Sequence, residues 1–419
     1  MPEMFKVRTV RLLRWSERYT NLDMVYFASG SFWQTFGQAG SSFLALGLLL
    51  VFANFLPKET YGTYRYLISL AAILNVFTLT GMSQAVAQAV ANGRDGVLRT
   101  AVRYQIKWNL LLMVASWALG AYYLWHENFA YGGALLVLSL CLPLTNAFNT
   151  YGPYLAAKRD FKLNNLFSIL STLIYVLGMF AAIFISGQVI WLVVAYALTT
   201  LAANALFYFL TLRMFKPPQE PAEDVLKYGR HLTYIGLMKP IVSQLDSIIL
   251  NHFWGAAPLA VYSIAVAIPN RAVPFIKDWV DLGFPKVAVK TPEDIDRTFY
   301  QRIAQGLFIG AVFAALYALA APLLFKYLLP QYLDAVLYTQ ILAVTFIFAM
   351  PNRYVSTLLA SQKMSKRIFT NSITISGVQL LLYAVLGIWG GILGLIVAQV
   401  LNGFIGLMIN IASWRFART

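Results

Sequence analysis

Residues Ile303 to Phe325 read IAQGLFIGAVFAALYALAAPLLF, an apolar run that contains no charged side chain. A helix of this length can cross the hydrocarbon core of a bilayer, because about 20 apolar residues suffice for one crossing. Similar runs fill most of the chain, and the expected spans are 27–55, 62–90, 103–125, 132–156, 164–186, 189–212, 231–253, 258–283, 303–325, 335–361, 368–387 and 391–413. The pattern predicts an all-α polytopic membrane protein with about twelve transmembrane helices.

The composition supports this prediction. Of the 419 residues, 59% are hydrophobic and 12% are charged, whereas a soluble domain carries about 25% charged residues. This balance argues against a soluble enzyme, and also against intrinsic disorder, which requires low hydrophobicity. With Cys141 as the only cysteine, an intrachain disulfide bond is excluded.

The net charge of +15 follows from membrane topology. If the amino terminus is cytoplasmic and the spans alternate, 25 of the 32 Lys and Arg residues fall on the inner side, while the outer loops hold only Lys58 and Lys326. Positive residues collect in cytoplasmic loops. We therefore expect both termini in the cytoplasm and no nucleic acid partner.

Two hydrophilic segments organise the chain. Residues 1–22 are basic with interspersed Leu, Val and Trp, which fits an amphipathic helix on the inner membrane surface or a solvated tail equally well. Residues 214–228, MFKPPQEPAEDVLKY, form the clearest linker and separate an N-lobe at 23–213 from a C-lobe at 229–419. Each lobe holds six expected spans, so both have the same orientation. We expect a pseudo-two-fold axis along the membrane normal, as in some secondary transporters.

Catalytic motifs are absent from the sequence. His126, His231 and His252 lie apart without metal-ligand spacing, and neither a Walker A loop nor a Gly-x-Ser-x-Gly elbow is present. We predict no enzymatic activity, no catalytic residues, no cofactor and no metal.

Charges inside the expected spans are the candidate functional residues, because each is costly if it faces lipid. Lys239 and Arg271 fall near the bilayer middle and Arg353 in the inner half. Asp246 follows Lys239 by seven residues, on roughly the same helical face. Arg65 lies about one turn inside the outer boundary, where snorkelling to the surface explains it equally well.

Further polar residues accompany these charges. Asn270 and Asn352 precede arginines in two Pro-Asn-Arg tripeptides, where proline loosens the helix and the amide can face a polar cavity. Prolines are also ordinary in membrane helices, so chance explains the match as well. Lys277, Asp278 and Asp281 end the eighth span, and we expect them at a gate or on the surface.

The embedded charges favour an anionic substrate. Lys239, Arg271 and Arg353 are opposed by one acid, Asp246, and guanidinium offers paired donors to phosphate oxygens. We predict that the three cations, with Arg65, Asn270 and Asn352, bind the substrate, and that Asp246 couples transport to an ion.

Three stretches resemble the oligosaccharide flippase, or polysaccharide transport, family, whose superfamily also holds multidrug exporters and lipid II flippases. They are Leu56-Pro-Lys-Glu-Thr-Tyr-Gly-Thr-Tyr64, Gly81-Met-Ser-Gln-Ala85 and Gln244-Leu-Asp-Ser-Ile248. The resemblance implies two lobes around a cationic cavity, and the flipping of undecaprenyl-pyrophosphate-linked glycans, such as O-antigen units, across a bacterial or archaeal inner membrane. It also implies membrane lipid, a coupling ion (H⁺ or Na⁺) and other polysaccharide assembly proteins as partners.

Two other functions remain open. An ion-coupled multidrug exporter of the same superfamily is disfavoured by the positive cavity and the few acids of the first half. A membrane glycosyltransferase or polymerase needs a large extramembrane loop with carboxylates, and the expected outer loops are short.

Cysteine labelling tests the predicted topology. In a Cys141-free background, cysteines at positions 58 and 328 should react with an impermeant maleimide added from outside. Cysteines at 162 and 365 should react only after the membrane is permeabilised. Labelling of 162 or 365 in sealed cells would contradict the assigned orientation.

Overall fold

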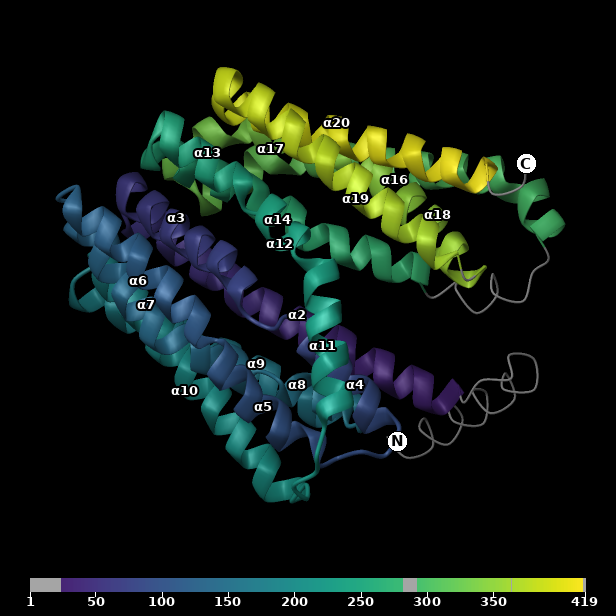
Figure 1. The fold of residues 1–419 in the computed structure, drawn as a ribbon. Helices are drawn as coiled ribbons and strands as arrows, with labels where there is room; N and C mark the ends of the chain where they lie inside the picture. Colours follow the sequence, from purple (N-terminus) through teal and green to yellow (C-terminus); the bar gives the residue numbers. More distant parts are fainter. Residues whose placement is uncertain (1–23, 282–291, 363, 417–419) are drawn as a thin grey trace, which may run out of the picture. The chain divides into compact units, whose positions relative to one another are not determined.

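The computed structural model describes residues 24–281, 292–362 and 364–416, and all regular structure in these ranges is helical (Figure 1). This confirms the predicted all-α class. The basic segment at 1–22 lies outside the described residues.

The chain forms two compact units, one comprising residues 1–48 and 71–237 and the other comprising residues 49–70 and 238–419. Two helices, α2 (Met24–Phe55) and α3 (Lys58–Leu74), contribute to both, because the hairpin that joins them belongs to the second unit. The units thus place 49–70 with the C-terminal helices, whereas the sequence pattern assigns this stretch to the N-lobe.

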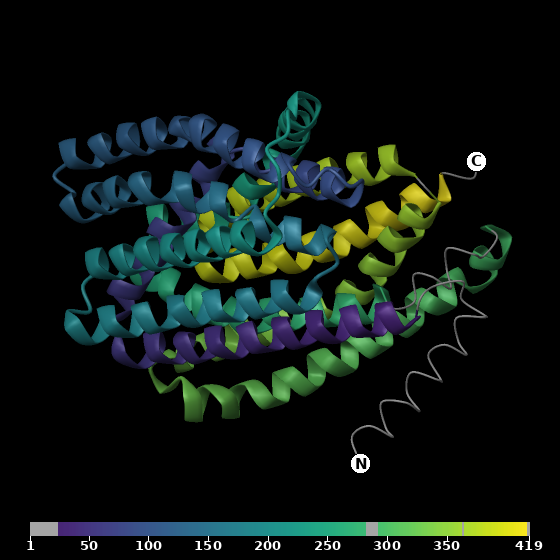
Figure 2. The ribbon, with the colours of Figure 1, turned by 90° about the horizontal axis from the view of Figure 1, so that it is seen from below.

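The first unit is built mainly from helical hairpins. Its further elements are η1 (Asn75–Phe77), α4 (Met82–Ala91), α5 (Val97–Trp108), α6 (Leu110–Trp125), α7 (Phe129–Phe148), α8 (Tyr151–Ala157), α9 (Phe161–Ile185), α10 (Val189–Phe215) and α11 (Glu223–Gly236). Figure 2 shows α6 against α7 and α9 against α10 as antiparallel pairs. Leu98, Tyr154 and Phe207 lie in a core that these helices share near the start of α5.

The second unit contains the remaining helices. They are α12 (Met238–Val242), α13 (Leu245–Trp254), α14 (Ala256–Asp281), α16 (Pro292–Leu328), η2 (Pro330–Ala335), α17 (Val336–Ala343), α18 (Thr345–Ser361), α19 (Ser365–Leu382), η3 (Tyr383–Gly387) and α20 (Ile388–Arg415). Gly391 breaks the last helix with φ 53°. On either side of this break, Asn371 donates a hydrogen bond to Asn410, 39 residues later in the sequence. The chain therefore doubles back, and α19 lies beside α20.

The hairpin at 49–70 is fastened to the second unit by specific contacts. Lys58 pairs with Asp334 at 2.8 Å, and the Asn54 amide donates to the Leu328 carbonyl at 3.0 Å. A Cβ at Gly62 would lie 1.8 Å from the Ala256 carbonyl oxygen. Glycine therefore permits α3 to approach α14 closely, which places Tyr61 and Arg65 within the second unit.

The described helices are those of a multi-span membrane protein. Eight are long and apolar enough to cross a membrane, or nine if the bent pair Lys58–Phe77 and Met82–Ala91 is one span. Large apolar side chains such as Phe308 and Leu319 are 72% and 75% exposed, as expected of a surface that lipid covers.

The sequence pattern predicts about twelve spans, more than the eight or nine helices that are long enough by themselves. The difference arises where an expected span is broken into shorter helices, or where two expected spans count as one. α6 has 16 residues, and a break at Asn109 separates it from α5. α12 and α13 are also short, with 5 and 10 residues. In addition, the doubled-back stretch Ser365–Arg415 counts only once, although it has 51 residues.

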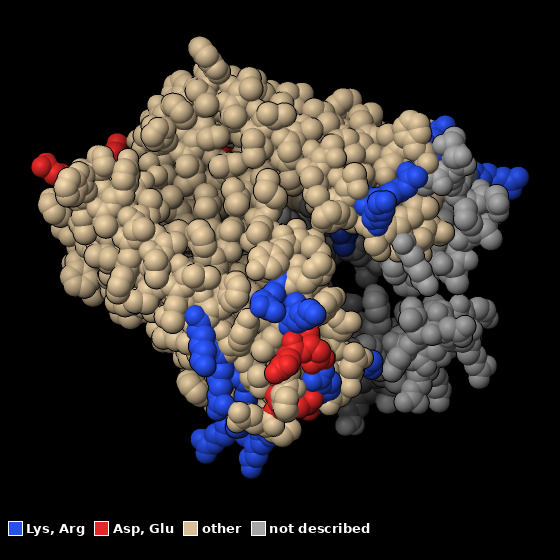
Figure 3. Space-filling view, in the orientation of Figure 1, with Lys and Arg blue, Asp and Glu red and all other residues tan. Residues whose placement is uncertain are grey.

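Charged side chains gather at one end of the first unit, around the start of α5 and the end of α10 (Figure 3). There Arg94 donates to Glu220 at 2.8 Å and to Asp224 at 2.6 Å. The hydrogen bonds from Arg94 hold the pKa of the Asp224 carboxyl below its usual range. Arg94 thus fastens the linker to the loop that precedes α5.

We predict that Arg94→Gln frees this linker. A spin label at position 219, in a Cys141-free background, should be immobilised in the parent protein and mobile in the variant at pH 7. Because the folded-state pKa of Asp224 is depressed, the Arg94 contact stabilises the linker fully at pH values above the ordinary carboxyl pKa of about 4. It is lost as pH falls through the lower folded value, so the parent label should become mobile only in acid. Arg213→Gln is the matched control, and equal mobility in Arg94→Gln and the parent at pH 7 would contradict the assignment.

Candidate functional site

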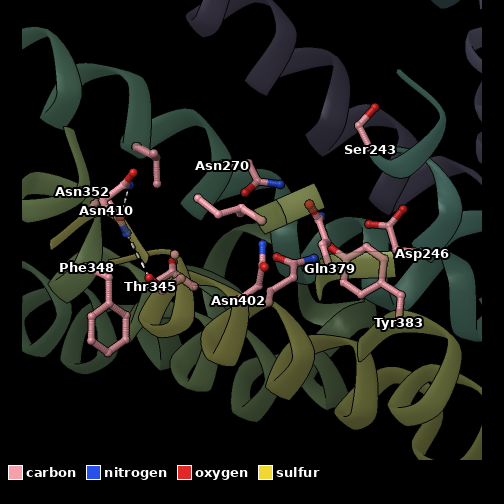
Figure 4. Close-up of a pocket in the computed structure, with 16 residues that line it drawn as sticks. Ser243, Asp246, Asn270, Thr345, Phe348, Asn352, Gln379, Tyr383, Asn402 and Asn410 are labelled. Atoms are coloured by element: carbon pink, nitrogen blue, oxygen red, sulfur yellow. Dashed lines mark hydrogen bonds between the residues drawn. The ribbon is translucent and has the colours of Figure 1, made fainter. Parts of the chain in front are cut away.

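A cavity of about 500 Å³ lies within the second unit (Figure 4). This volume is typical of a small-molecule site. Helices α13, α14, α18, α19 and α20, with η3, supply its walls. The polar lining combines one carboxylate with six carboxamides, namely Asp246 and Asn270, Asn352, Gln379, Gln399, Asn402 and Asn410.

A break in the helix places Asp246. The expected span at 231–253 is divided between α11, α12 and α13, and Asp246 falls in the first turn of α13. Backbone N–H groups at a helix start lack helical partners and favour a negative charge. The Ser247 N–H donates to Asp246 Oδ1 at 2.6 Å. Discontinuous membrane helices of this kind often form ion or substrate sites.

Neutral donors complete the surroundings of the carboxylate. The Tyr262 hydroxyl donates to Asp246 Oδ2 at 2.5 Å, and it accepts in turn from Gln399 Nε2. Every hydrogen bond that Asp246 makes within the described chain comes from an uncharged group. The charge of Arg65 acts on the carboxylate at longer range, without a hydrogen bond.

Three asparagines form a second polar chain across α18, α19 and α20. Asn371 donates to Asn410 at 2.9 Å, and Asn410 donates to Asn352 at 3.0 Å. Asn352 then donates to the Gly403 carbonyl at 2.9 Å. The amides of Asn410 and Asn352 have a fixed orientation, because each donates to the next acceptor while its own oxygen accepts from the preceding amide.

The arrangement suits a small cation or a hydroxyl-rich ligand. A carboxylate and amide oxygens are hard ligands for a proton or an alkali ion, and amides pair with hydroxyl groups. Asn402 Oδ1 is buried and makes no hydrogen bond to any described atom. Within the residues that the structure describes, no three His, Cys, Asp or Glu side chains are grouped to hold a metal ion.

The cavity brings together three of the residues predicted from the sequence, Asp246, Asn270 and Asn352. Arg65 and Arg271 are outside its lining but near each other, since the charges of both act on the Tyr61 hydroxyl. All five belong to the second unit.

The other predicted residues have different positions. Arg353 is exposed and outside the lining, although it adjoins Asn352. Neighbouring residues of a helix point about 100° apart, which explains the difference. Lys239 lies in α12, and Lys277, Asp278 and Asp281 lie in α14; the side chains of all four are outside the described part.

Several site residues carry no sequence signal. Tyr262 contacts Asp246 directly but lies 16 residues further along the chain. Gln399 contacts Tyr262 and lies 137 residues beyond it. Asn410 and Gln379 are amides in largely apolar helices, where helix packing explains them equally well. Only the register of the packed helices reveals their grouping.

Comparisons with known proteins identify relatives of this architecture. The family model described as polysaccharide biosynthesis protein matches residues 27–276. No curated protein matches the sequence. Among solved structures, lipid II flippase MurJ in an inward closed conformation is similar, with a TM-score of 0.67 and 14% identity over 93% of this chain and 87% of that one.

A multidrug resistance MATE family transporter of the MOP superfamily is also similar. Its outward-facing form gives a TM-score of 0.60 at 15% identity, covering 91% of this chain and 93% of that one. Its inward-facing form gives 0.60 at 16% identity, covering 93% and 96%. At these identities the likeness shows a shared fold.

The asparagine chain predicts a stability difference between two cavity residues. Asn410→Ala should lower the free energy of unfolding by about 1–3 kcal/mol, because it leaves buried groups of Asn371 and Asn352 without partners. Asn402→Ala removes an amide from the same wall but breaks no hydrogen bond of its Oδ1, so it should cost less. Thermal unfolding in detergent measures both. Equal melting temperatures for the two variants would contradict the assigned chain.

Proposed function

We propose, from the premise that the chain belongs to the polysaccharide biosynthesis protein family, that it flips a polyprenyl-pyrophosphate-linked oligosaccharide from the inner to the outer leaflet. The glycan would be an O-antigen or another surface polysaccharide unit. The observation that carries the proposal is the cavity in the second unit, where one carboxylate stands among six carboxamides. A glycan and a pyrophosphate cannot cross hydrocarbon unaided, whereas a prenyl tail can remain in lipid.

The proposed topology has twelve spans in two six-helix lobes with both termini cytoplasmic. The bent pair α3–α4, the broken pair α5–α6, the interrupted α11–α13 and the doubled-back α19–α20 each supply spans that a length criterion undercounts. The distribution of basic residues sets the orientation. The membrane is then the cytoplasmic membrane of a bacterium or archaeon.

In the proposed mechanism Asp246 binds the coupling ion, H⁺ or Na⁺. Its hydrogen-bond donors in the described chain are all neutral, so an incoming cation meets a carboxylate that no described cation contacts directly. Binding would reorient the Tyr262 hydroxyl, which then no longer donates to the same oxygen. Because Tyr262 also accepts from Gln399, the change would be transmitted from α13 through α14 to α20.

The cations of the same unit would receive the pyrophosphate. Arg65 and Arg271 share one neighbourhood around Tyr61, and guanidinium groups match phosphate oxygens bidentately. Lys239 and Arg353 complete the proposed cationic set, while Asn270 and Asn352 would bind hydroxyl groups of the glycan. Lys277, Asp278 and Asp281 remain the proposed gate residues.

One observation favours a second candidate, an ion-coupled exporter of organic cations. The cavity holds a carboxylate and two aromatic rings, Phe348 and Tyr383, and a cation can bind both. The surplus of amides over acids fits a neutral or hydroxyl-rich guest better. Drug sensitivity of the expressing strain separates the two functions.

Substitutions at Asp246 and Arg271 test the proposed function. In a strain that lacks its own flippase, Asp246→Asn should reduce surface glycan severely, because the neutral amide lacks the negative charge that attracts the coupling ion. Arg271→Lys should impair export although charge is kept, since it loses the bidentate geometry, and Arg271→Ala should impair it further.

Arg213→Ala, at an exposed position of the first unit, serves as the matched control, and membrane levels of all variants are compared by immunoblot. Normal surface glycan in both Asp246→Asn and Arg271→Ala at equal protein level would remove these residues from the mechanism. Loss of drug resistance without loss of glycan would instead support the exporter.

A further inference from the structure

Helix α5 presents two opposite faces. Val97, Leu98, Ala101, Val102 and Gln105 are buried against the first unit. Arg99, Arg103 and Lys107 follow one another at four-residue intervals on the other side. We call these three residues the basic row. At 1.5 Å per residue, it extends about 12 Å along the helix.

Within the described part of the chain, no acid neutralises the basic row. Among the described residues, none of its three side chains forms a hydrogen bond or an ion pair, and Arg99 Nε is buried without a partner. Three of the acids at this end of the unit are held by other cations. Glu220 and Asp224 bind Arg94, and Asp95 binds Lys158.

Tyr208 of α10 lies within electrostatic range of two members of the row. The charges of Arg99 and Arg103 both act on its hydroxyl. Two guanidinium groups and a phenol hydroxyl supply donors of the kind that bind phosphate oxygens. A buried, unpaired guanidinium nitrogen is costly, and a phosphate oxygen would satisfy it.

We propose that the basic row, together with Tyr208, binds the phosphates of anionic phospholipid headgroups. The inference rests on the proposed function in one respect only, the orientation that places this end of α5 at the inner leaflet. Headgroups of a lipid layer suit the row better than one substrate pyrophosphate does, because the cations are spread over two helical turns. Charged side chains also gather at this end of the unit, beyond its apolar surface (Figure 3).

Lipid titration tests this site without reference to transport. Full-length protein in detergent is titrated with phosphatidylglycerol and, separately, with phosphatidylcholine, and bound lipids are counted by native mass spectrometry. The parent should prefer phosphatidylglycerol. In Arg99→Gln/Arg103→Gln/Lys107→Gln the preference should fall about fivefold for each cation removed.

A charge-matched variant provides the control. Arg213→Gln/Lys216→Gln/Lys227→Gln removes three exposed cations from the same unit and should keep the parental preference. If the triple α5 variant fails to fold, Arg103→Gln/Lys107→Gln, which changes only exposed side chains, should still lose about 25-fold.

Three results would overturn the proposal. The first is equal loss in the α5 and control variants, which would indicate general charge attraction. The second is no preference for phosphatidylglycerol in the parent. The third is a row variant that keeps this preference but loses binding of undecaprenyl pyrophosphate, which would assign the row to the transported substrate. None of these lipid-binding measurements depends on flipping. A failed transport assay would therefore count against the proposed function, and a failed lipid assay against the lipid site.

Discussion

A carboxylate inside an apolar helix bundle is costly unless hydrogen-bond donors surround it. Asp246 meets this constraint through a helix break that directs the Ser247 N–H at it, and through the Tyr262 hydroxyl of α14. Tyr262 is fixed in turn by Gln399 of α20. The carboxylate therefore links α13, α14 and α20 through hydrogen bonds. Each polar group that is brought in as a donor, first Tyr262 and then Gln399, needs a hydrogen-bond partner in its turn.

The asparagine chain extends this principle to the other end of the cavity. It joins α18, α19 and α20 through side-chain amides and ends on a backbone carbonyl. The second unit thus has a polar interior whose walls are held by directed hydrogen bonds rather than by apolar contacts alone.

Much of the architecture could be predicted from the sequence, since hydropathy and the placement of Lys and Arg report directly on membrane crossing. Asp246, Asn270 and Asn352 could be singled out as polar residues in apolar spans, and the structure places all three at one cavity. Arg353 illustrates the limit of this reasoning. It shares the tripeptide of Asn352, yet one step along a helix turns it away.

Other features depend on helix register and close packing, which hydropathy does not encode. Nothing near Asp246 in the sequence indicates Tyr262 or Gln399 as partners. The assignment of 49–70 to the second unit depends on Gly62, whose missing side chain allows contact with Ala256. The span count also depends on such local geometry, because the chain reverses near Gly391, where the backbone leaves the helical conformation, and the two helices on either side count as one long span.

The central claim is that this chain moves a polyprenyl-pyrophosphate glycan across a bilayer under the control of Asp246. Its most direct test is purified protein in proteoliposomes that carry a fluorescent undecaprenyl-pyrophosphate oligosaccharide, with flipping read from the fraction that dithionite quenches from outside. The account predicts that an imposed H⁺ or Na⁺ gradient accelerates flipping in the parent and leaves Asp246→Asn near the rate of protein-free vesicles. Equal rates for parent, Asp246→Asn and protein-free vesicles under both gradients would contradict it.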